Sequence, residues 1–289
     1  GYAVFQTDGE LNRARVAAGT TNPDPMTRIT LFKRKQTTPE RLNGRELLRR
    51  YDLLPEECHY NEISCKRCAD CITYGFAVGD GGSEKSKVYA DSAFSLTDYG
   101  TSHEVFTLNA PYEDGTMSEK GVVTSRISQQ DHVKPGVIFP AVITTRDLTE
   151  ALFVYVLNNV LRTTRYGATT TRGGTVRNHV AAIILSDGEI FSNLLFTQRL
   201  FDALPSNPGL DPVPVGAALE AALKLIPALL AEDSVRDHQV LLGTALDEYL
   251  ASVRGMDEAT LVNWLRKAHE QTREYYDSNI AKDSAKSSR

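Results

Sequence analysis

All four cysteines of this 289-residue sequence fall within fourteen positions, at Cys58, Cys65, Cys68 and Cys71. Cysteines two residues apart can direct their thiolates to one tetrahedral ion, and Cys58 can complete the shell from a preceding loop. This clustering is typical of a metal site and not of a disulfide framework. We therefore predict a structural metal ion, with zinc as the first choice, in a closed site that leaves no position for a substrate.

Three alternatives to a four-thiolate zinc site are open at this stage. The two C-x-x-C pairs share Cys68, which leaves little room for all three cysteines to reach one ion, so His59 could replace one of the cysteines as a ligand. The run also resembles iron–sulfur ligation, although the proline and fourth cysteine that follow in bacterial ferredoxins are absent. The third alternative is four reduced thiols without a metal.

Two basic segments contrast with an acidic remainder. Residues 13–50 hold ten basic and three acidic residues, and residues 160–180 hold four arginines and no acid. Their net charges of +7 and +4 leave −16 for the rest of a chain whose total is −5. The total by itself argues against a nucleic-acid ligand, but the distribution favours a basic interaction surface.

Residues suited to single-stranded nucleic acid lie among these basic residues. Arginine contacts phosphate with two hydrogen bonds, aromatic rings stack on bases, and glycines let a backbone approach closely. The glycine pair is Gly173 and Gly174, and the aromatic candidates are Tyr51, Phe32 and Tyr166. Apolar alternation along the preceding strand favours a core position for Phe32.

The sequence contains no convincing catalytic motif. Its six histidines form no H-E-x-x-H pair, and its glycine run at 79–82 lacks the ending of a phosphate-binding loop. The carboxylates of Asp8, Glu10 and Asp24 could position a metal ion for strand cleavage. We therefore predict a binding protein and not an enzyme, with a metal-dependent nuclease that cuts the bound strand as the alternative.

Patterning and turn signals predict the elements that position these residues. Residues 28–35 alternate as a strand that leads into an exposed loop, and Thr38 predicts the start of a helix on which Arg41, Arg45 and Arg49 face outward. Residues 100–136 predict a long protruding hairpin or loop.

The second half of the chain predicts further elements. We expect a strand over 137–145, a buried central helix over 152–164, and a hairpin turn at the Asp-Gly pair 187–188. Three helices are expected from residue 216 on. This order indicates an α+β fold with insertions.

The chain has no segment typical of a membrane protein or a secreted one. No stretch approaches the roughly 18 apolar residues of a membrane helix, and the start lacks the features of a signal peptide. We expect a soluble, cytoplasmic protein without a membrane partner. Its first residue is Gly and not Met, which predicts a trimmed chain.

Several segments resemble the backbone subunit of type I-D CRISPR effector (Cascade) complexes, the Csc-type member of the seventh Cas protein family in the RAMP superfamily. They are FQTDGELNRARV, RITLFKRKQTTPERLNGRELLRRYDLLP, the cysteine segment, YADSAFSLTDYGTSHEVFTLNAPYEDGTMSEKG and TTRYGATTTRGGTVRN. The resemblance extends from Phe5 to about Arg199. It implies an RNA-recognition-like (ferredoxin-like) core, with family sequence ahead of Phe5 that this chain lacks.

The resemblance also implies a role in antiviral defence. Copies of the protein would stack head to tail in an open filament along a CRISPR guide RNA and present it to a target nucleic-acid strand, together with other effector-complex subunits. Such stacking needs an acidic face against a basic one, and the charge separation is compatible with that. A thumb-like hairpin from each copy would insert between nucleotides, with Met117 or Tyr112 as the wedge.

The predicted parts are a first piece of the core (1–51), a cysteine metal-binding insertion (52–75), core strands (76–100), a thumb-like hairpin insertion (101–136), a second piece of the core with a Gly-rich loop (137–215), a helical region (216–277) and a polar tail (278–289). The residues predicted to bind RNA are Arg13, Arg15, Arg28, Lys33, Arg34, Lys35, Arg41, Arg45, Arg165, Tyr166, Arg172, Gly173, Gly174 and Arg177.

Overall fold

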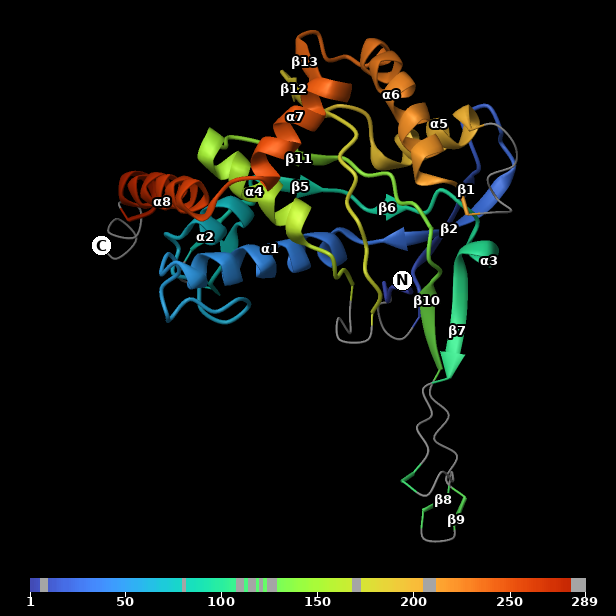
Figure 1. The fold of residues 1–289 in the computed structure, drawn as a ribbon, viewed down its shortest axis with the longest axis horizontal. Coiled ribbons are helices and arrows are strands. Elements are labelled where there is room, and N and C mark those ends of the chain that lie inside the picture. The colour runs from blue at the N-terminus through green and yellow to red at the C-terminus, as the bar shows by residue number, and fades with distance from the viewer. Residues whose placement is uncertain are drawn as a thin grey trace.

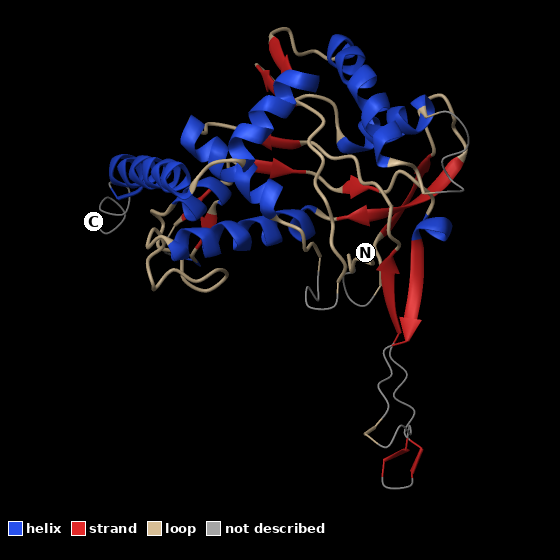
Figure 2. Cartoon of the chain, in the orientation of Figure 1, coloured by secondary structure: helices blue, strands red, loops and turns tan. Residues whose placement is uncertain are grey.

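The computed structural model combines helices with short strands, as Figure 2 shows. The structure describes residues 1–5, 10–79, 82–107, 112–113, 118–119, 122–123, 129–167, 173–204 and 212–281. All pairs of described strands are antiparallel. The mixed helix and sheet composition is confirmed. The largest sheet among these residues has three strands, in the order β1-β2-β6, so the RNA-recognition-like core stays a prediction.

The elements are named as in Figure 1. The strands are β1 (Arg13–Ala17), β2 (Pro25–Leu31), β3 (Phe76–Ala77), β4 (Ser83–Glu84), β5 (Val88–Ala90), β6 (Ala93–Phe94), β7 (His103–Thr107), β8 (Ser118–Glu119), β9 (Val122–Val123), β10 (Gln129–Val133), β11 (Ile143–Thr145), β12 (Ile183–Ser186) and β13 (His238–Leu241). The helices are α1 (Lys33–Arg50), α2 (Ala69–Tyr74), α3 (Tyr99–Ser102), α4 (Glu150–Arg162), α5 (Asn193–Ala203), α6 (Val215–Glu232), α7 (Gly243–Arg254), α8 (Glu258–Tyr275) and a π-helical turn, η2 (Tyr276–Ile280). Within the described ranges, no helix is both long enough and apolar enough to cross a bilayer.

Helix α4 lies at the centre of the helical part of the molecule, packed against α1, α7 and α8 (Figure 1). Its side chains are mostly buried because its sequence, EALFVYVLNNVLR, is apolar around most of its circumference. The N-cap is Thr149, whose side chain accepts a hydrogen bond from the Leu152 backbone N–H. The predicted buried helix is therefore confirmed.

Helix α1 begins earlier than the sequence indicated. Its first residue is Lys33, with Phe32 as the N-cap, and Pro39 lies inside the helix. The start is fixed by Gln36, whose side-chain amide donates to the carbonyls of Leu31 (3.1 Å) and Asp91 (2.9 Å). This tertiary anchor outweighs the local signal that predicted a start at Thr38, and it turns the basic run into the first helical turn.

A two-stranded arm projects from the body of the molecule (Figure 1). Strands β7 and β10 pair from His103 opposite Val133 to Thr107 opposite Gln129, and β8 pairs with β9 near its far end. The predicted protruding hairpin is therefore present at its base. Tyr112 lies in the described part of the arm and is half-buried, whereas Met117 lies outside the described residues.

Two predictions for the second half of the chain differ from the structure. The Asp-Gly pair at 187–188 does not close a hairpin, because β12 pairs with β13, about fifty residues later, and α5 follows instead of a strand. Only 143–145 of the strand expected over 137–145 forms a ladder, with β5. Long-range strand pairing decided both differences. The three helices expected from residue 216 on are present as α6, α7 and α8.

Candidate metal centre and nucleic-acid interface

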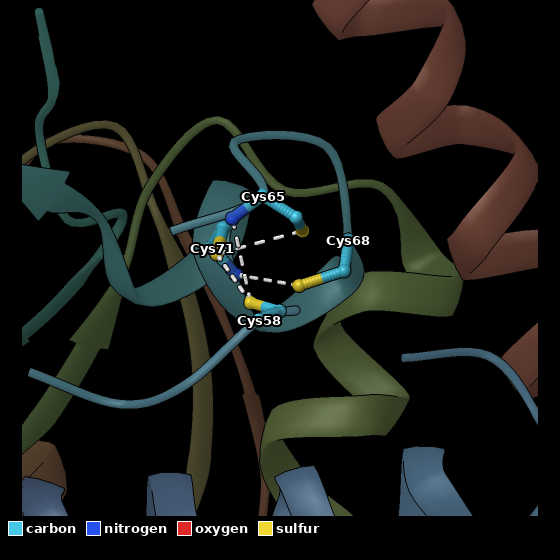
Figure 3. Close-up of side chains that lie close together, drawn as sticks. All are labelled: Cys58, Cys65, Cys68 and Cys71. Atoms are coloured by element: carbon cyan, nitrogen blue, oxygen red, sulfur yellow. Dashed lines mark hydrogen bonds between the residues drawn. The ribbon is translucent and has the colours of Figure 1, made fainter. Parts of the chain in front are cut away.

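The four cysteine side chains converge on one point (Figure 3). Their Sγ atoms lie within 4.8 Å of one another, with 3.6 Å between Cys58 and Cys71 and 3.9 Å between Cys65 and Cys71. An ion with four tetrahedral bonds to sulfur of about 2.3 Å places these sulfurs about 3.8 Å apart. The cysteines therefore fit a single tetrahedral ion, whereas a cluster of several irons would hold its thiolates farther apart.

Local backbone geometry prepares this site. Cys68 is the N-cap of α2, and its Sγ accepts a hydrogen bond from the Cys71 N–H, while the Cys58 Sγ accepts one from the Cys65 N–H (both 3.4 Å). Hydrogen bonds from the thiols of Cys65, Cys68 and Cys71 hold the pKa of Cys58 well below its usual range. His59 is exposed and lies outside the group, so the histidine-ligand alternative is not supported.

A buried ion-pair network joins this cysteine module, residues 52–75, to α1. Asp70 is fully buried and accepts hydrogen bonds from Arg45 (2.6 Å) and from Nε of Arg41 (2.9 and 3.0 Å). The second Nη of Arg45 donates to the carbonyl of Cys58 (2.6 Å) and approaches its Sγ (3.5 Å). The prediction that Arg41 and Arg45 face outward to RNA is wrong, because a buried carboxylate needs cationic partners and these two satisfy it.

The module also packs against the C-terminal helices. Leu53, Leu54 and the buried cysteines share one apolar cluster with Leu265 and Ala268 of α8 and with buried residues of α4. A metal ion at this site would therefore stabilise contacts between parts of the chain about two hundred residues apart.

Arg28 was also predicted to contact RNA, and this prediction is wrong. Its side chain is fully buried and donates to the carbonyls of Ser95 and Leu96 (both 2.6 Å) and to that of Ala18. The guanidinium lies 5.2 Å from the ring centroid of Phe201, and burial lowers the pKa of Arg28 to about 10. Arg28 thus ties β2 to neighbouring backbone.

The Gly-rich segment docks on α1 at a position that a proline creates. Pro39 has no N–H, so it leaves the carbonyl of Lys35 without its helical partner. The Gly167 N–H donates to that carbonyl (3.3 Å). Gly167 has a φ of +87°, and a Cβ there would lie 2.0 Å from the carbonyl oxygen of Val4, so the close contact requires glycine.

The glycine pair predicted to approach a phosphate instead accommodates the N-terminal segment. Gly173 is buried, and its carbonyl accepts a hydrogen bond from Arg165. A Cβ at Gly174 would lie within 2.5 Å of the Gly1 and Tyr2 backbones. These two glycines are therefore corrected to a packing role.

A buried carboxyl lies beneath this segment. Glu40 is 2% exposed, and its Oε1 accepts a hydrogen bond from Tyr166 (2.8 Å), whose hydroxyl accepts one from Asn178 (2.6 Å). All three residues line a mainly apolar cavity of about 1340 Å³. The prediction that Tyr166 contacts RNA is wrong, since its ring is buried and its hydroxyl is engaged.

Glu40 should make folding stability pH-dependent. Burial raises the pKa of Glu40 from 4.5 to about 7, although the hydrogen bond from Tyr166 opposes the shift. The folded state then binds the carboxyl proton of Glu40 more tightly than the unfolded state does. The protonated Glu40 therefore contributes to folding stability fully below about pH 4.5, and this contribution is lost as the pH rises through 7. The loss is at most roughly 3 kcal/mol, at about 1.4 kcal/mol per pH unit.

Glu40→Gln should therefore gain stability over the wild type as the pH rises, measured by urea unfolding between pH 5 and pH 8. Glu46→Gln, an exposed glutamate on the same helix, should follow the wild type, and a Glu40→Gln profile parallel to the wild type would refute this assignment.

The remaining basic residues of the predicted set stay at the surface. They are Arg13, Arg15, Lys33, Arg34, Lys35, Arg165 and Arg177, of which Lys35 is half-buried and the others are exposed. No described carboxylate forms an ion pair with them, whereas Arg49, Arg50 and Arg199 each pair with a glutamate. Arg172 lies outside the described residues.

Backbone contacts bring the segments that carry these residues together. The start of α1 contacts Gly167, which forms a bridge with Val4, while the adjacent Ala3 forms one with Val133 of the arm. The N-terminus accordingly lies between α1 and the arm (Figure 1). The same strand of the arm, β10, also receives the Leu11 N–H, just ahead of β1, which donates to Asp131 (3.3 Å). These contacts join the start of α1, residues 165–167 and 173–177, the base of the arm and β1, which we call the basic edge.

Sequence reasoning missed two residues of this arrangement. Asp70 lies between Cys68 and Cys71 and is the only charged residue of ADCITY, the otherwise uncharged sequence of α2, and this context was the available signal. Phe32 was assigned to the core by strand alternation, but it is 42% exposed because the chain turns into α1 at this position.

Comparisons with known proteins define first the class of fold and then the family. The fold resembles a chain of a CRISPR RNA-guided surveillance complex, with a TM-score of 0.53, 12% identity and 83% of each chain covered. It also resembles the crystal structure of Thermofilum pendens Csc2, with a TM-score of 0.59 and 16% identity over 96% of this chain and 86% of that chain. The fold is therefore of the class found in CRISPR surveillance complexes. The Csc2 CRISPR family model matches residues 1–263, so the chain belongs to the Csc2 family, and the resemblance seen in the sequence is confirmed. A comparison with curated proteins gives no match.

Proposed function

We propose that this chain binds the guide RNA of a CRISPR surveillance complex as one of its backbone subunits. The observation that carries the proposal is the basic edge, where seven cations without described carboxylate partners lie on segments joined by backbone contacts. Cations that lack described carboxylate partners attract phosphates, and exposed basic side chains on segments that contact the base of a projecting arm suit a strand that passes this base. Membership of the Csc2 family supports the same role.

Head-to-tail stacking of copies, capture of the target strand and contact with other effector subunits belong to the same proposal. The similar chain from a surveillance complex supports an assembled role, and the −16 charge outside the two basic segments offers acidic surface for a neighbour's basic edge. An RNA-recognition-like core with a zinc-binding insertion and a thumb-like arm is the fold that goes with this role.

We also propose that the metal is a single zinc ion. Zinc favours four thiolates in tetrahedral geometry, and the sulfur separations of 3.6 and 3.9 Å match that geometry. An ion with four cysteine ligands has no open coordination position, so its role is structural. The zinc ion would hold the cysteine module in place against α1 and would not contact the RNA itself.

Charge reversal at the basic edge tests the RNA-binding role. We expect Arg34→Glu and Arg177→Glu to weaken binding of single-stranded RNA about equally for all sequences, because phosphate contacts carry no sequence information. Each lost phosphate contact should cost about fivefold in affinity at 0.1 M salt and lower the salt slope by about 0.7. Fluorescence anisotropy over a salt series measures both quantities.

Arg266→Glu is the matched control, since Arg266 is an exposed helical arginine on α8, outside both basic segments. It should bind RNA like the wild type. If all three variants bound RNA with the affinity of the wild type, the basic edge would not be the RNA-binding surface. Unchanged melting temperatures would show that a loss of affinity is not caused by unfolding.

Metal-dependent strand cleavage stays the alternative to this role. Asp8 lies outside the described residues, and the four cysteines form the only metal-ligand group found within the described ones.

A further inference from the structure

Phe32 presents its ring to solvent at the junction of β2 and α1. The side chain is 42% exposed, although full burial of a phenylalanine is worth roughly 1.5–3 kcal/mol. The residue occupies the N-cap position, where a side chain that caps the helix would be expected, but it contributes no side-chain cap. The Phe32 side chain therefore neither packs fully into the core nor caps the helix.

The backbone around Phe32 is held firmly. Its carbonyl accepts a hydrogen bond from the Lys35 N–H (2.8 Å), and the preceding carbonyl, of Leu31, accepts one from the buried Gln36 side chain. Gln36 also bonds Asp91 in the connection between β5 and β6. A ring with two rotatable side-chain angles on a fixed turn loses little conformational entropy when it stacks on a ligand.

The surroundings of Phe32 belong to the basic edge. The next two residues, Lys33 and Arg34, are exposed and have no described carboxylate partner, and the Lys35 carbonyl contacts Gly167. A nucleotide that places its phosphate against this first helical turn brings its base within reach of the adjacent ring.

The other two aromatic candidates of the basic segments are already engaged. Tyr166 is buried against Glu40, and the hydroxyl of Tyr51 donates to Glu258 on α8 (3.0 Å). Among the other exposed large apolar side chains of the described residues, Leu42 on α1 and Val105 on β7 have no aromatic ring that could stack on a base, whereas Tyr89 on β5 and Leu185 on β12 lie outside the basic edge. Phe32 is the aromatic candidate that combines exposure with a basic setting.

We propose that Phe32 is a stacking platform for a nucleobase of the bound single strand, an inference that rests on the RNA-binding role proposed above. Lys33 and Arg34 neutralise the phosphate, and the ring supplies a contact that tolerates any base, because every base has a π-face. The edge thereby distinguishes an unpaired strand from a duplex, in which the bases are stacked on one another.

The test compares the full chain with its Phe32→Ala and Phe32→Trp variants by anisotropy with single-stranded RNA over a salt series. Stacking is worth about 1–3 kcal/mol per base, so Phe32→Ala should bind roughly 5- to 140-fold more weakly. Its salt slope should equal that of the wild type, because no phosphate contact is lost. Phe32→Trp should keep the affinity, and Leu185→Ala, which removes another exposed apolar side chain, should match the wild type.

A second RNA, in which abasic residues replace the bases, completes the design. On this RNA the wild type should lose its advantage over Phe32→Ala. Equal affinity of Phe32→Ala and wild type for ordinary RNA, or a slope lowered together with the affinity, would overturn the stacking role while leaving the basic edge intact. A wild type that binds no RNA would overturn the proposed function itself.

Discussion

Replacing Cys71 with serine should lower the melting temperature by about 10 °C or more and reduce the bound metal below one ion per chain. Structural zinc contributes apparent binding free energies of about 10–16 kcal/mol in small domains, so a loss of at least about 5 kcal/mol is expected here. Such a loss corresponds to about 2–4 °C for each kcal/mol in a domain of 150–250 residues. The expected damage extends beyond the module, because its cysteines share an apolar cluster with α4 and α8.

Ser64→Ala is the matched control for this experiment. Ser64 donates a hydrogen bond to the Cys71 Sγ (3.1 Å) but is not one of the four ligands, so the variant should keep its metal. Chelation of the wild type should reproduce the effect of Cys71→Ser. Elemental analysis should find one zinc in a colourless protein, whereas iron with brown absorption would reverse the choice of metal, and a metal-free wild type with the same stability would end the metal proposal.

Replacing Asp70 with alanine should destabilise the protein by about 3–5 kcal/mol, because it leaves the buried Arg45 without its counter-ion. The melting temperature should fall by about 6–20 °C, by the same conversion. Arg41→Ala should cost less, since Arg41 is 16% exposed and its removal leaves Asp70 paired with Arg45. Thermal unfolding monitored by circular dichroism measures the three proteins side by side.

The double variant Asp70→Leu with Arg45→Met separates a buried pair from a generally sensitive site. Replacing both charges by apolar side chains removes the uncompensated ion, so the double variant should be more stable than Asp70→Ala. A melting temperature for Asp70→Ala within about 2 °C of the wild type, or a double variant less stable than the single one, would show that the network contributes little.

Helix α1 connects the two sites described above. Its first turn carries Lys33 and Arg34 at the basic edge, and a later face carries Arg41 and Arg45 into the cysteine module. The Gly167 contact and the Glu40–Tyr166 hydrogen bond attach the segment after α4 to the stretch between them. The cysteine module thus contacts the helix whose start we propose to bind RNA, so a metal ion bound there would act on RNA binding only indirectly, through α1.

Features set by local spacing could be predicted from the sequence. Cysteines two residues apart can reach one ion whatever surrounds them, and a mostly apolar stretch such as EALFVYVLNNVLR is buried in almost any fold. The helices α6 and α8 and the base of the arm follow from similar local signals, as does the choice of the Csc2 family from longer segments.

Which charged side chains face solvent was beyond the sequence. Arg28, Arg41, Arg45 and Arg34 all lie in the same basic segment of the sequence. Arg28 donates to buried carbonyls and Arg41 and Arg45 pair with Asp70, whereas Arg34 is exposed. The hydrogen-bond partners lie 25 or more residues away in most of these contacts. The local sequence around an arginine does not indicate which distant oxygen accepts a hydrogen bond from its guanidinium.

The sequence by itself determined the group of four cysteines, the central and C-terminal helices and the existence of two basic segments, because these depend on residue type and short-range periodicity. Only the tertiary structure decided the start of α1, the pairing of β12 with β13, the burial of Tyr166 and the exposure of Phe32. The physical reason is that a buried polar group must find a partner wherever the fold offers one, and its free energy outweighs the local preferences of a few residues.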